Sequence, residues 1–270
     1  MSLNESQIAA AAEAISRGRS RQRQPIGELP GELQPRDVDE AMAIQDALHP
    51  LLTERGLGPV VGTKIGCTTK VMQEYLGMTH PCAGAIFSTT VRDGDGSFDF
   101  DSFLHVGVEC EIAVRLSEPI LRSSAAHTFD SVSECVEAFF PAIEIVDDRY
   151  EDFVARRPDW RTWVADDFFG AGIVLGPAVT DWRQLDLADL RGVMKINDVE
   201  VGAGHGRDII NGHPLEALVW LANHESKRGR DLPSGWVVML GSVVQTKWVA
   251  RGDVVQVELE GLGRAAAKFV

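Results

Sequence analysis

The sequence lacks the paired cysteines and the long apolar runs that identify several common classes of protein. Its four cysteines lie far apart and form no C-x-x-C pair, so neither a zinc site nor a disulfide scaffold is indicated, and a reducing compartment suits them best. No stretch approaches the roughly 20 apolar residues that cross a bilayer, and we expect no secretory signal at the N-terminus. The sequence therefore predicts a cytoplasmic protein with no membrane partner.

Basic residues are also few. The 270 residues include 26 Lys and Arg against 40 Asp and Glu, which gives a formal net charge of −14 at pH 7. A chain of this charge is repelled by nucleic-acid phosphates, so no nucleic-acid partner is expected, and an anionic substrate would need a local cation. The one basic run, "RGRSRQRQ" at residues 17–24, is interpreted as an exposed helix end whose arginines suit the C-terminal dipole, not as an RNA site.

Helical patterns are concentrated before residue 59. One helix is predicted after Asn4, and a second follows the apolar spacing of residues 38–51 and stops near Gly56. From residue 59 onward, β-branched runs separated by Gly, Asp and Asn predict strands, with hairpins about residues 197–198 and 261–263. Two later helices are predicted, over residues 131–139 and 213–229.

The order of these elements favours one fold class. Strands dominate without alternating regularly with helices, which argues against a doubly wound parallel sheet and favours a mixed β-roll or barrel-like body of the α+β class. We predict a small N-terminal helical region at residues 1–58 and a catalytic β-roll domain at residues 59–270.

Two glutamates share one face of a predicted strand. In "VGVECEIAVRL", residues 106–116, Glu109 and Glu111 alternate with apolar residues, which by itself fits a half-exposed antiparallel strand equally well. A third carboxylate, Glu144 in "FFPAIEIVDDRY", lies in a run that is apolar on both faces, where an unpaired charge costs several kcal/mol or more. Three carboxylates from two strands would make an all-oxygen site, which suits Mg²⁺ or Mn²⁺.

A lysine lies in an equally apolar setting. Lys64 in "VVGTKIGCT" occupies a segment that should form a buried strand. It could be a lysine that extends to solvent from a strand end, or an acid/base or anion-binding lysine whose pKa falls on desolvation. The pattern alone does not choose between these two readings.

Several segments, in order over nearly the whole chain, resemble the 2-keto-4-pentenoate hydratase and 4-oxalocrotonate decarboxylase branch of the fumarylacetoacetate hydrolase superfamily. These segments are "VVGTKIGCT", "VECEIAV", "PAIEIVDDRY", "VADDFFGAGIVLG", "GHPLEALVWLAN" and "GDVVQVELEGLGRAAAKF". The resemblance implies a small N-terminal helical part and a mixed β-sandwich roll that holds a divalent metal. It assigns the metal ligands to Glu109, Glu111 and Glu144, and it assigns catalytic roles to Lys64 and Asp166.

Two segments depart from the pattern of this branch. Where relatives show "EPDFG", this chain has "THPCAG", so Cys82 replaces a substrate-side Asp, with His80 close by. Where relatives show an "ADNAS" type of segment, this chain has "ADDFF", so Asp167 replaces the usual Asn and Phe169 replaces the serine. We expect His80, Cys82 and Phe169 to contact a substrate that differs from the standard dienoate or is less polar.

The resemblance also implies an activity. The first expectation is a metal-dependent hydratase that adds water to a 2-hydroxy-2,4-dienoate in the catabolism of aromatic compounds, with Mg²⁺ or Mn²⁺ as cofactor and a homo-oligomeric assembly. In that reaction the substrate's C1 carboxylate and C2 oxygen would chelate the metal, and Lys64 would carry the proton. The alternatives, in order, are a decarboxylase of a 2-oxo-3-enedioate, a C–C hydrolase of acylpyruvate type and a non-catalytic accessory subunit.

Overall fold

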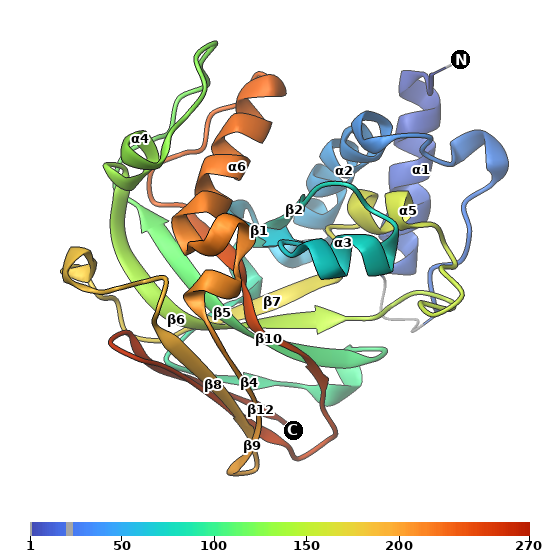
Figure 1. Ribbon diagram of the computed structural model, residues 1–270. Helices are drawn as coiled ribbons and strands as arrows, with labels where there is room; N and C mark the ends of the chain where they lie inside the picture. Colours follow the sequence, from blue (N-terminus) through green and yellow to red (C-terminus); the bar gives the residue numbers. More distant parts are fainter. Residues whose placement is uncertain (1, 20–23) are drawn as a thin grey trace.

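The computed structural model describes residues 2–19 and 24–270 as two β-sheets with helices at one end (Figure 1). The larger sheet has seven strands in the order β2-β1-β10-β5-β6-β7-β3, and the smaller has five in the order β4-β12-β11-β8-β9. Parallel and antiparallel pairs occur in both sheets, since β1 runs parallel to β10 and β12 runs parallel to β4. The predicted mixed β-roll of the α+β class is therefore confirmed.

The larger sheet contains the three longest strands of the described residues, which have 11 or 12 residues each. In spatial order they are β2 Cys82–Phe87, β1 Val60–Gly66, β10 Val237–Trp248, β5 Val106–Leu116, β6 Val136–Asp147, β7 Gly170–Leu175 and β3 Val91–Asp93. The smaller sheet consists of β4 Asp95–Phe98, β12 Gly263–Phe269, β11 Val254–Leu259, β8 Arg191–Ile196 and β9 Val199–His205. The two predicted hairpins are confirmed as β8–β9 and β11–β12.

The larger sheet curls until β2 contacts β7, and the smaller sheet packs on its outer face. The outward residues of β5, such as Val108 and Ile112, are completely buried against apolar residues of the second sheet, such as Val257. Because successive side chains on a strand point to opposite faces, Glu109 and Glu111 point into the curl. The inter-sheet core therefore fixes which residues line the interior of the roll.

The described residues also form six α-helices: α1 Glu5–Gly18, α2 Val38–Leu52, α3 Lys70–Leu76, α4 Phe129–Ser133, α5 Trp160–Ala165 and α6 Pro214–Lys227. Helices α1, α2 and α5 pack together at one end of the roll, while α6 lies against β10 (Figure 1). The cap of α1 is the predicted Asn4, and Gly56 adopts a positive φ of 101° where the second helical segment ends. Among the described residues no helix is long and apolar enough to span a membrane.

One predicted helix is largely wrong. Residues 131–139 were expected to be helical, but α4 ends at Ser133 and β6 begins at Val136. From Val136 onward the segment pairs with β5, where Arg115 lies opposite Ala138. Pairing with a long neighbouring strand outweighs the weak helical spacing of this segment.

The proposed division of the chain at residue 58 stays a prediction. Helices α1 and α2, which precede residue 58, share an apolar core with α5, which follows it.

Candidate active site

The register of β5 and β6 brings three glutamates together inside the roll. Glu109 lies directly opposite Glu144, and Glu111 follows two residues later on the same face of β5. One carboxylate oxygen from each residue lies within 4.8 Å of those of the other two. Glu111 and Glu144 are only 1% and 2% exposed while Glu109 is half-buried, so the half-exposed strand considered for the sequence is wrong at Glu111.

Strand β10 orients two of these carboxylates. The hydroxyl of Thr246 donates a hydrogen bond to Glu109 Oε1, and the Gly241 N–H donates to Glu111 Oε2 at 2.7 Å. The β10–β5 register shifts on either side of Ser242, and Gly241 takes a φ of 136°, a conformation that favours glycine. A Cβ at Gly241 would also lie 2.8 Å from Thr68 Oγ1, so this bulge requires glycine to aim its N–H at Glu111.

The charge of the three glutamates is not balanced by protein groups. Burial raises the pKa of Glu111 well above its usual range, and the negative charges of Glu144 and Glu109 raise it further. Burial likewise raises the pKa of Glu144 to about 7, although Lys64 opposes the rise. Three clustered carboxylates, of which the buried Glu111 and Glu144 have elevated pKa values, fit a hard divalent cation such as Mg²⁺ or Mn²⁺, which would supply the missing charge.

Lys64 lies in the middle of β1 and is 3% exposed, so it is not a lysine that reaches solvent from a strand end. Its Nζ lies 3.1 Å from Glu144 Oε1 in an ion pair, and that buried oxygen accepts no hydrogen bond among the described residues. The ammonium instead donates to the Phe168 carbonyl and lies 5.0 Å from the centroid of the Phe168 ring. Burial opposes the charge on Lys64, but Glu144, Cys82 and Glu109 together raise its pKa.

The turn that supplies this carbonyl has an unusual backbone. Asp167, Phe168 and Phe169 have φ values of 55°, 45° and 66°, and such left-handed conformations cost about 1–3 kcal/mol each for residues other than glycine. The Phe169 ring points away from Lys64 into an aromatic cluster, 4.8 Å from the ring of Tyr150. The predicted contact of Phe169 with the substrate stays a prediction, and the neighbouring Phe168 is the residue that meets Lys64.

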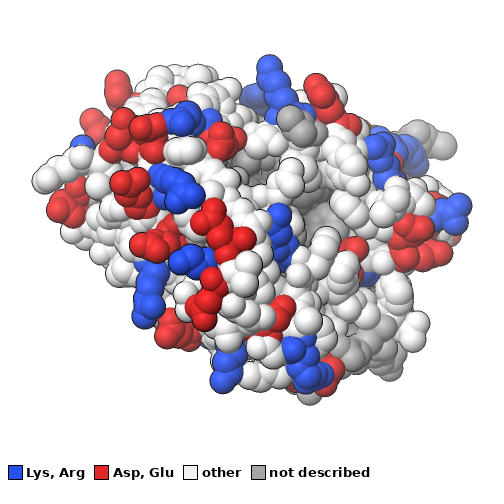
Figure 2. Space-filling model, turned by 60° about the horizontal axis from the view of Figure 1, so that its bottom comes forward, with Lys and Arg blue, Asp and Glu red and all other residues white. Residues whose placement is uncertain are grey.

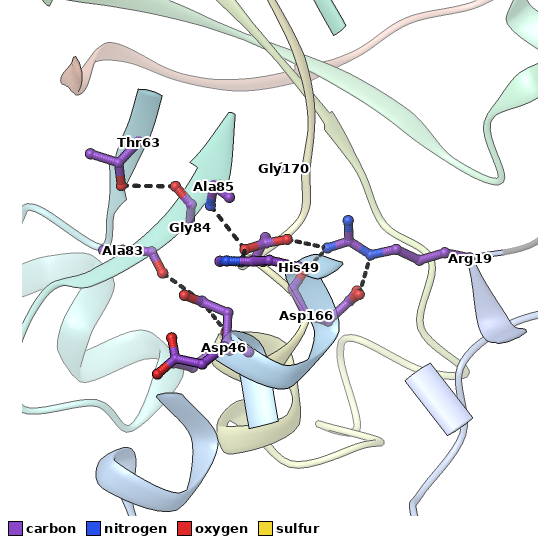
Figure 3. A network of polar contacts seen from close by, with 12 residues as sticks. Arg19, Asp46, His49, Thr63, Ala83, Gly84, Ala85, Asp166 and Gly170 are labelled. Carbon is purple, nitrogen blue, oxygen red and sulfur yellow. Dashed lines mark hydrogen bonds and ion pairs between the residues drawn. The ribbon is translucent and has the colours of Figure 1, made fainter. Parts of the chain in front are cut away.

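Asp166 lies at the start of this turn and is completely buried. Its carboxylate accepts hydrogen bonds from Arg19, from Arg149 Nη1 at 3.1 Å and from the Tyr150 hydroxyl at 3.0 Å, and the contact with Arg19 is visible in Figure 3. These contacts use both carboxylate oxygens, whereas its predicted catalytic role would require a free one. That role stays a prediction.

The interpretation of the basic run as exposed is wrong for Arg19. Its side chain is 9% exposed and pairs with Asp166 (Figure 3). It also pairs with Asp167, whose Oδ2 lies 3.0 Å from Arg19 Nη2. The run looked like a solvated helix end because its acidic partners lie about 150 residues further along the chain, where no local pattern can reveal them. Residues 20–23 of the run lie outside the described part of the structure.

Cys82 and His80 lie in different surroundings. Cys82 begins β2 opposite Gly66 and is 3% exposed, and burial raises the pKa of its thiol although Lys64 opposes the rise. His80 is half-buried, its Nδ1 lies 2.7 Å from the Pro81 carbonyl oxygen, and its ring meets Trp160 edge-on. The structure therefore brings Cys82 within electrostatic reach of Lys64, while the recorded contacts of His80 are to Pro81 and Trp160.

A cavity of about 940 Å³ reaches this group of residues, and its wall includes Lys64, Glu144, Arg149, Gly170 and Ile173. Its volume is typical of a pocket for a small organic molecule. Figure 2 shows a face of the molecule that is hollowed near its centre, with acidic and basic side chains scattered among uncharged ones. Because this face carries no continuous basic surface, an anionic substrate would depend on groups inside the cavity.

Comparisons with known proteins agree with this arrangement. Residues 88–270 match the family described as fumarylacetoacetate (FAA) hydrolase C-terminal. The chain is 31% identical to 4-oxalocrotonate decarboxylase of Pseudomonas putida over 99% of this chain and 98% of that protein. It is 32% identical to 2-keto-4-pentenoate hydratase 2 of Dechloromonas aromatica (strain RCB) over 96% of each.

A solved structure extends the likeness to three dimensions. The 4-oxalocrotonate decarboxylase of Pseudomonas putida G7, complexed with magnesium and adipate, superposes with a TM-score of 0.90 at 27% identity and covers 100% of this chain and 99% of its own. The fold, the acidic cluster and the near-complete coverage by these relatives lead to one conclusion. The chain belongs to the fumarylacetoacetate hydrolase family, in the branch that contains 2-keto-4-pentenoate hydratases and 4-oxalocrotonate decarboxylases.

Proposed function

We propose that this protein is a divalent-metal-dependent lyase of 2-oxo acids, and specifically a decarboxylase of a 2-oxo-3-enedioate in the catabolism of aromatic compounds. The observation that carries the proposal is the position of Lys64, which lies beside Glu144 of the acidic cluster while its ammonium is held by the Phe168 carbonyl. A charged proton donor next to a cation site is the arrangement that a reaction through an enolate requires.

In this proposal Glu109, Glu111 and Glu144 would hold Mg²⁺ or Mn²⁺, which would supply a Lewis acid for the 2-oxo group of the substrate. The bond to the distal carboxylate breaks, and its electron pair moves through the C3–C4 double bond to the C2 oxygen, so that CO₂ and a 2-hydroxy-2,4-dienoate form. Lys64 gives the proton that the C2 oxygen takes up. The raised pKa of Lys64 keeps this donor protonated before the reaction.

Two observations favour decarboxylation over hydration. Hydration adds water at the distal end of the substrate and benefits from an acid or base there. At Lys64 the neighbour outside the acidic cluster is Cys82, whose thiol stays neutral because burial raises its pKa. Decarboxylation needs no added water, and the similar decarboxylase structure contains adipate, a six-carbon dicarboxylate.

Hydration of 2-hydroxypenta-2,4-dienoate is the second candidate. Relatives named as 2-keto-4-pentenoate hydratases are 31–32% identical to this chain, so the level of identity does not separate the two activities. The acidic cluster and Lys64 could serve the enol-to-oxo step of hydration as well. The dienoate that decarboxylation releases is also the kind of compound that a hydratase consumes.

The test supplies the purified protein and Mn²⁺ with 2-oxohex-3-enedioate and, separately, with 2-hydroxypenta-2,4-dienoate. We expect one CO₂ released per enedioate consumed, with loss of activity in EDTA. Lys64→Met should still bind Mn²⁺ in calorimetry but lose turnover. Water addition to the dienoate without CO₂ release from the enedioate would make the protein a hydratase. Inactivity with both, and with acylpyruvates, would favour an accessory subunit.

A further inference from the structure

The left-handed turn at residues 167–169 is held in place by groups outside it. Asp167 is completely buried, and its Oδ1 lies 2.7 Å from His49 Nε2 and accepts the Ala85 N–H at 2.9 Å. Its Oδ2 accepts from Arg19 Nη2 at 3.0 Å. Three successive residues with positive φ persist only where the surroundings fix them, so these contacts define the shape of the turn.

Two of these groups come from the N-terminal helices. Arg19 follows the end of α1, and His49 lies in the last turn of α2, so both reach the turn from segments remote in sequence (Figure 3). Arg19 also donates to the backbone carbonyl and to the carboxylate of Asp166. The two helices therefore hold both Asp166 and Asp167 in place.

The turn at residues 167–169 also fixes the position of the Lys64 side chain. The Phe168 carbonyl accepts a hydrogen bond from Lys64 Nζ, and its ring packs so closely on Gly66 that a Cβ there would lie 2.5 Å from the ring. On the other side, a Cβ at Gly84 would lie 2.6 Å from the Asp167 carbonyl oxygen. Because the turn sits directly on β1 and β2, a displacement of Asp167 moves the acceptor that directs the Lys64 ammonium.

We propose that Arg19 and His49 are positioning residues, which act through Asp167 and the Phe168 carbonyl to aim Lys64 at the substrate. The N-terminal helices are then part of the catalytic apparatus and not only a support for the roll. This inference rests on the proposed role of Lys64 as proton donor, but the geometry that it describes can be tested without any substrate.

The principal experiment compares Arg19→Met with Arg228→Met. Arg228 is a matched control, since it also follows the end of a helix, α6, and ties that helix to α2 through Asp46 Oδ1 at 2.7 Å. For Arg19→Met we expect kcat to fall at least about tenfold, with KM and the Mn²⁺ dissociation constant unchanged within about twofold, because only the aim of the donor is lost. Arg228→Met should match the parent.

A second readout follows the turn itself. Carbamylation of Lys64 by cyanate, measured by peptide mass spectrometry relative to the exposed Lys268, should rise several-fold in Arg19→Met and stay at the parental rate in Arg228→Met. If the parent protein turns over no substrate, the proposed function fails while the labelling still decides this inference. Equal behaviour of the two variants in labelling would overturn it.

His49 provides a pair of variants should Arg19→Met fail to fold. His49→Gln keeps a nitrogen donor for Asp167, whereas His49→Leu removes it. We expect Gln to retain most of the parental kcat and the protection of Lys64, and Leu to lose both with Mn²⁺ binding intact. If Leu and Gln are indistinguishable, or if both lose Mn²⁺ affinity, His49 has no positioning role.

Discussion

Two buried acidic clusters lie close together in this protein, and they differ in how their charge is balanced. Glu109, Glu111 and Glu144 face one lysine, whereas Asp166 and Asp167 are matched by Arg19, Arg149 and hydrogen-bond donors such as Tyr150 and Ala85. Burial raises the pKa of Glu144 to about 7. Burial acts on Asp167 in the same sense, but His49 and Arg19 outweigh it and hold the pKa of that carboxyl well below its usual range.

This difference in charge balance indicates which cluster stabilises the fold and which could take part in a reaction. A buried carboxylate with arginine partners and backbone donors is complete, and its function is to fix the chain around it. A buried carboxylate whose protein partners are too few is incomplete, and a cation would complete it. The two kinds of cluster meet at Lys64, which lies beside Glu144 and is bonded to Phe168 in the turn that the aspartates fix.

The largest effect that should follow from this contrast is on stability. Asp166→Asn removes the negative charge between Arg19 and Arg149, which leaves Arg19 with Asp167 and Arg149 with Asp147, 3.8 Å away, so unfolding should become easier by about 3–5 kcal/mol with or without Mn²⁺. Urea denaturation measures this change. Glu13→Gln, which removes the exposed partner of Arg55, is the control and should cost less than about 1 kcal/mol. Equal losses would erase the distinction between the clusters.

The dependence of stability on pH should have opposite signs in the two clusters. A carboxyl whose folded pKa is raised stabilises the fold fully below its unfolded pKa, and this contribution is lost as the pH rises through the folded value. For Glu144 in metal-free protein the loss should run from about pH 4.5 to about pH 7 and amount to roughly 3 kcal/mol. For Asp167, whose folded pKa is lowered, stability should instead be lost as the pH falls below about 4.

Denaturation midpoints between pH 3 and pH 8, measured with EDTA and with excess Mn²⁺, check this expectation. Glu144→Gln should reduce the slope above pH 4.5 to the part that Glu111 contributes, since the pKa of Glu111 is raised as well, and should leave the acid limb unchanged. Asp167→Asn should instead flatten the acid limb alone. Mn²⁺ should also flatten the upper slope in the parent, because it replaces the protons that the folded state would bind. A slope above pH 4.5 that is as steep in Glu144→Gln as in the parent would assign it to another group.

The same contrast explains what the sequence could predict. The candidate cation site could be predicted from the sequence, because Glu109 and Glu111 alternate with apolar residues along one strand and Glu144 is a lone charge in an apolar run. The hairpins and α6 carry local turn and capping residues and were predicted for the same reason. Period and turn chemistry are local properties, and they are visible in a single chain.

The contacts of the charge-balanced cluster, Asp166 and Asp167, could not be predicted from the sequence. Arg19 lies in a run that resembles a solvated helix end, and Phe168 differs from Phe169 only in which way a left-handed turn directs each ring. Residues 136–139 were predicted to be helical because their local spacing does not show that they pair with β5, a strand some 20 residues upstream. Each of these depends on contacts between distant segments, which local pattern does not record.

The smallest expected effect tests whether β10 tunes the acidic cluster. The Thr246 hydroxyl donates to Glu109 Oε1 and so orients this carboxylate, and loss of such an outer hydrogen bond costs metal affinity about 10- to 100-fold in comparable sites. Thr246→Val should therefore weaken Mn²⁺ binding about tenfold in calorimetry, which is about 1.4 kcal/mol. Thr246→Ser keeps the hydroxyl and should bind as the parent does. If Thr246→Val binds Mn²⁺ as tightly as the parent does, the hydrogen bond of Thr246 has no effect on the metal site, and Glu109 would be oriented by the cation alone.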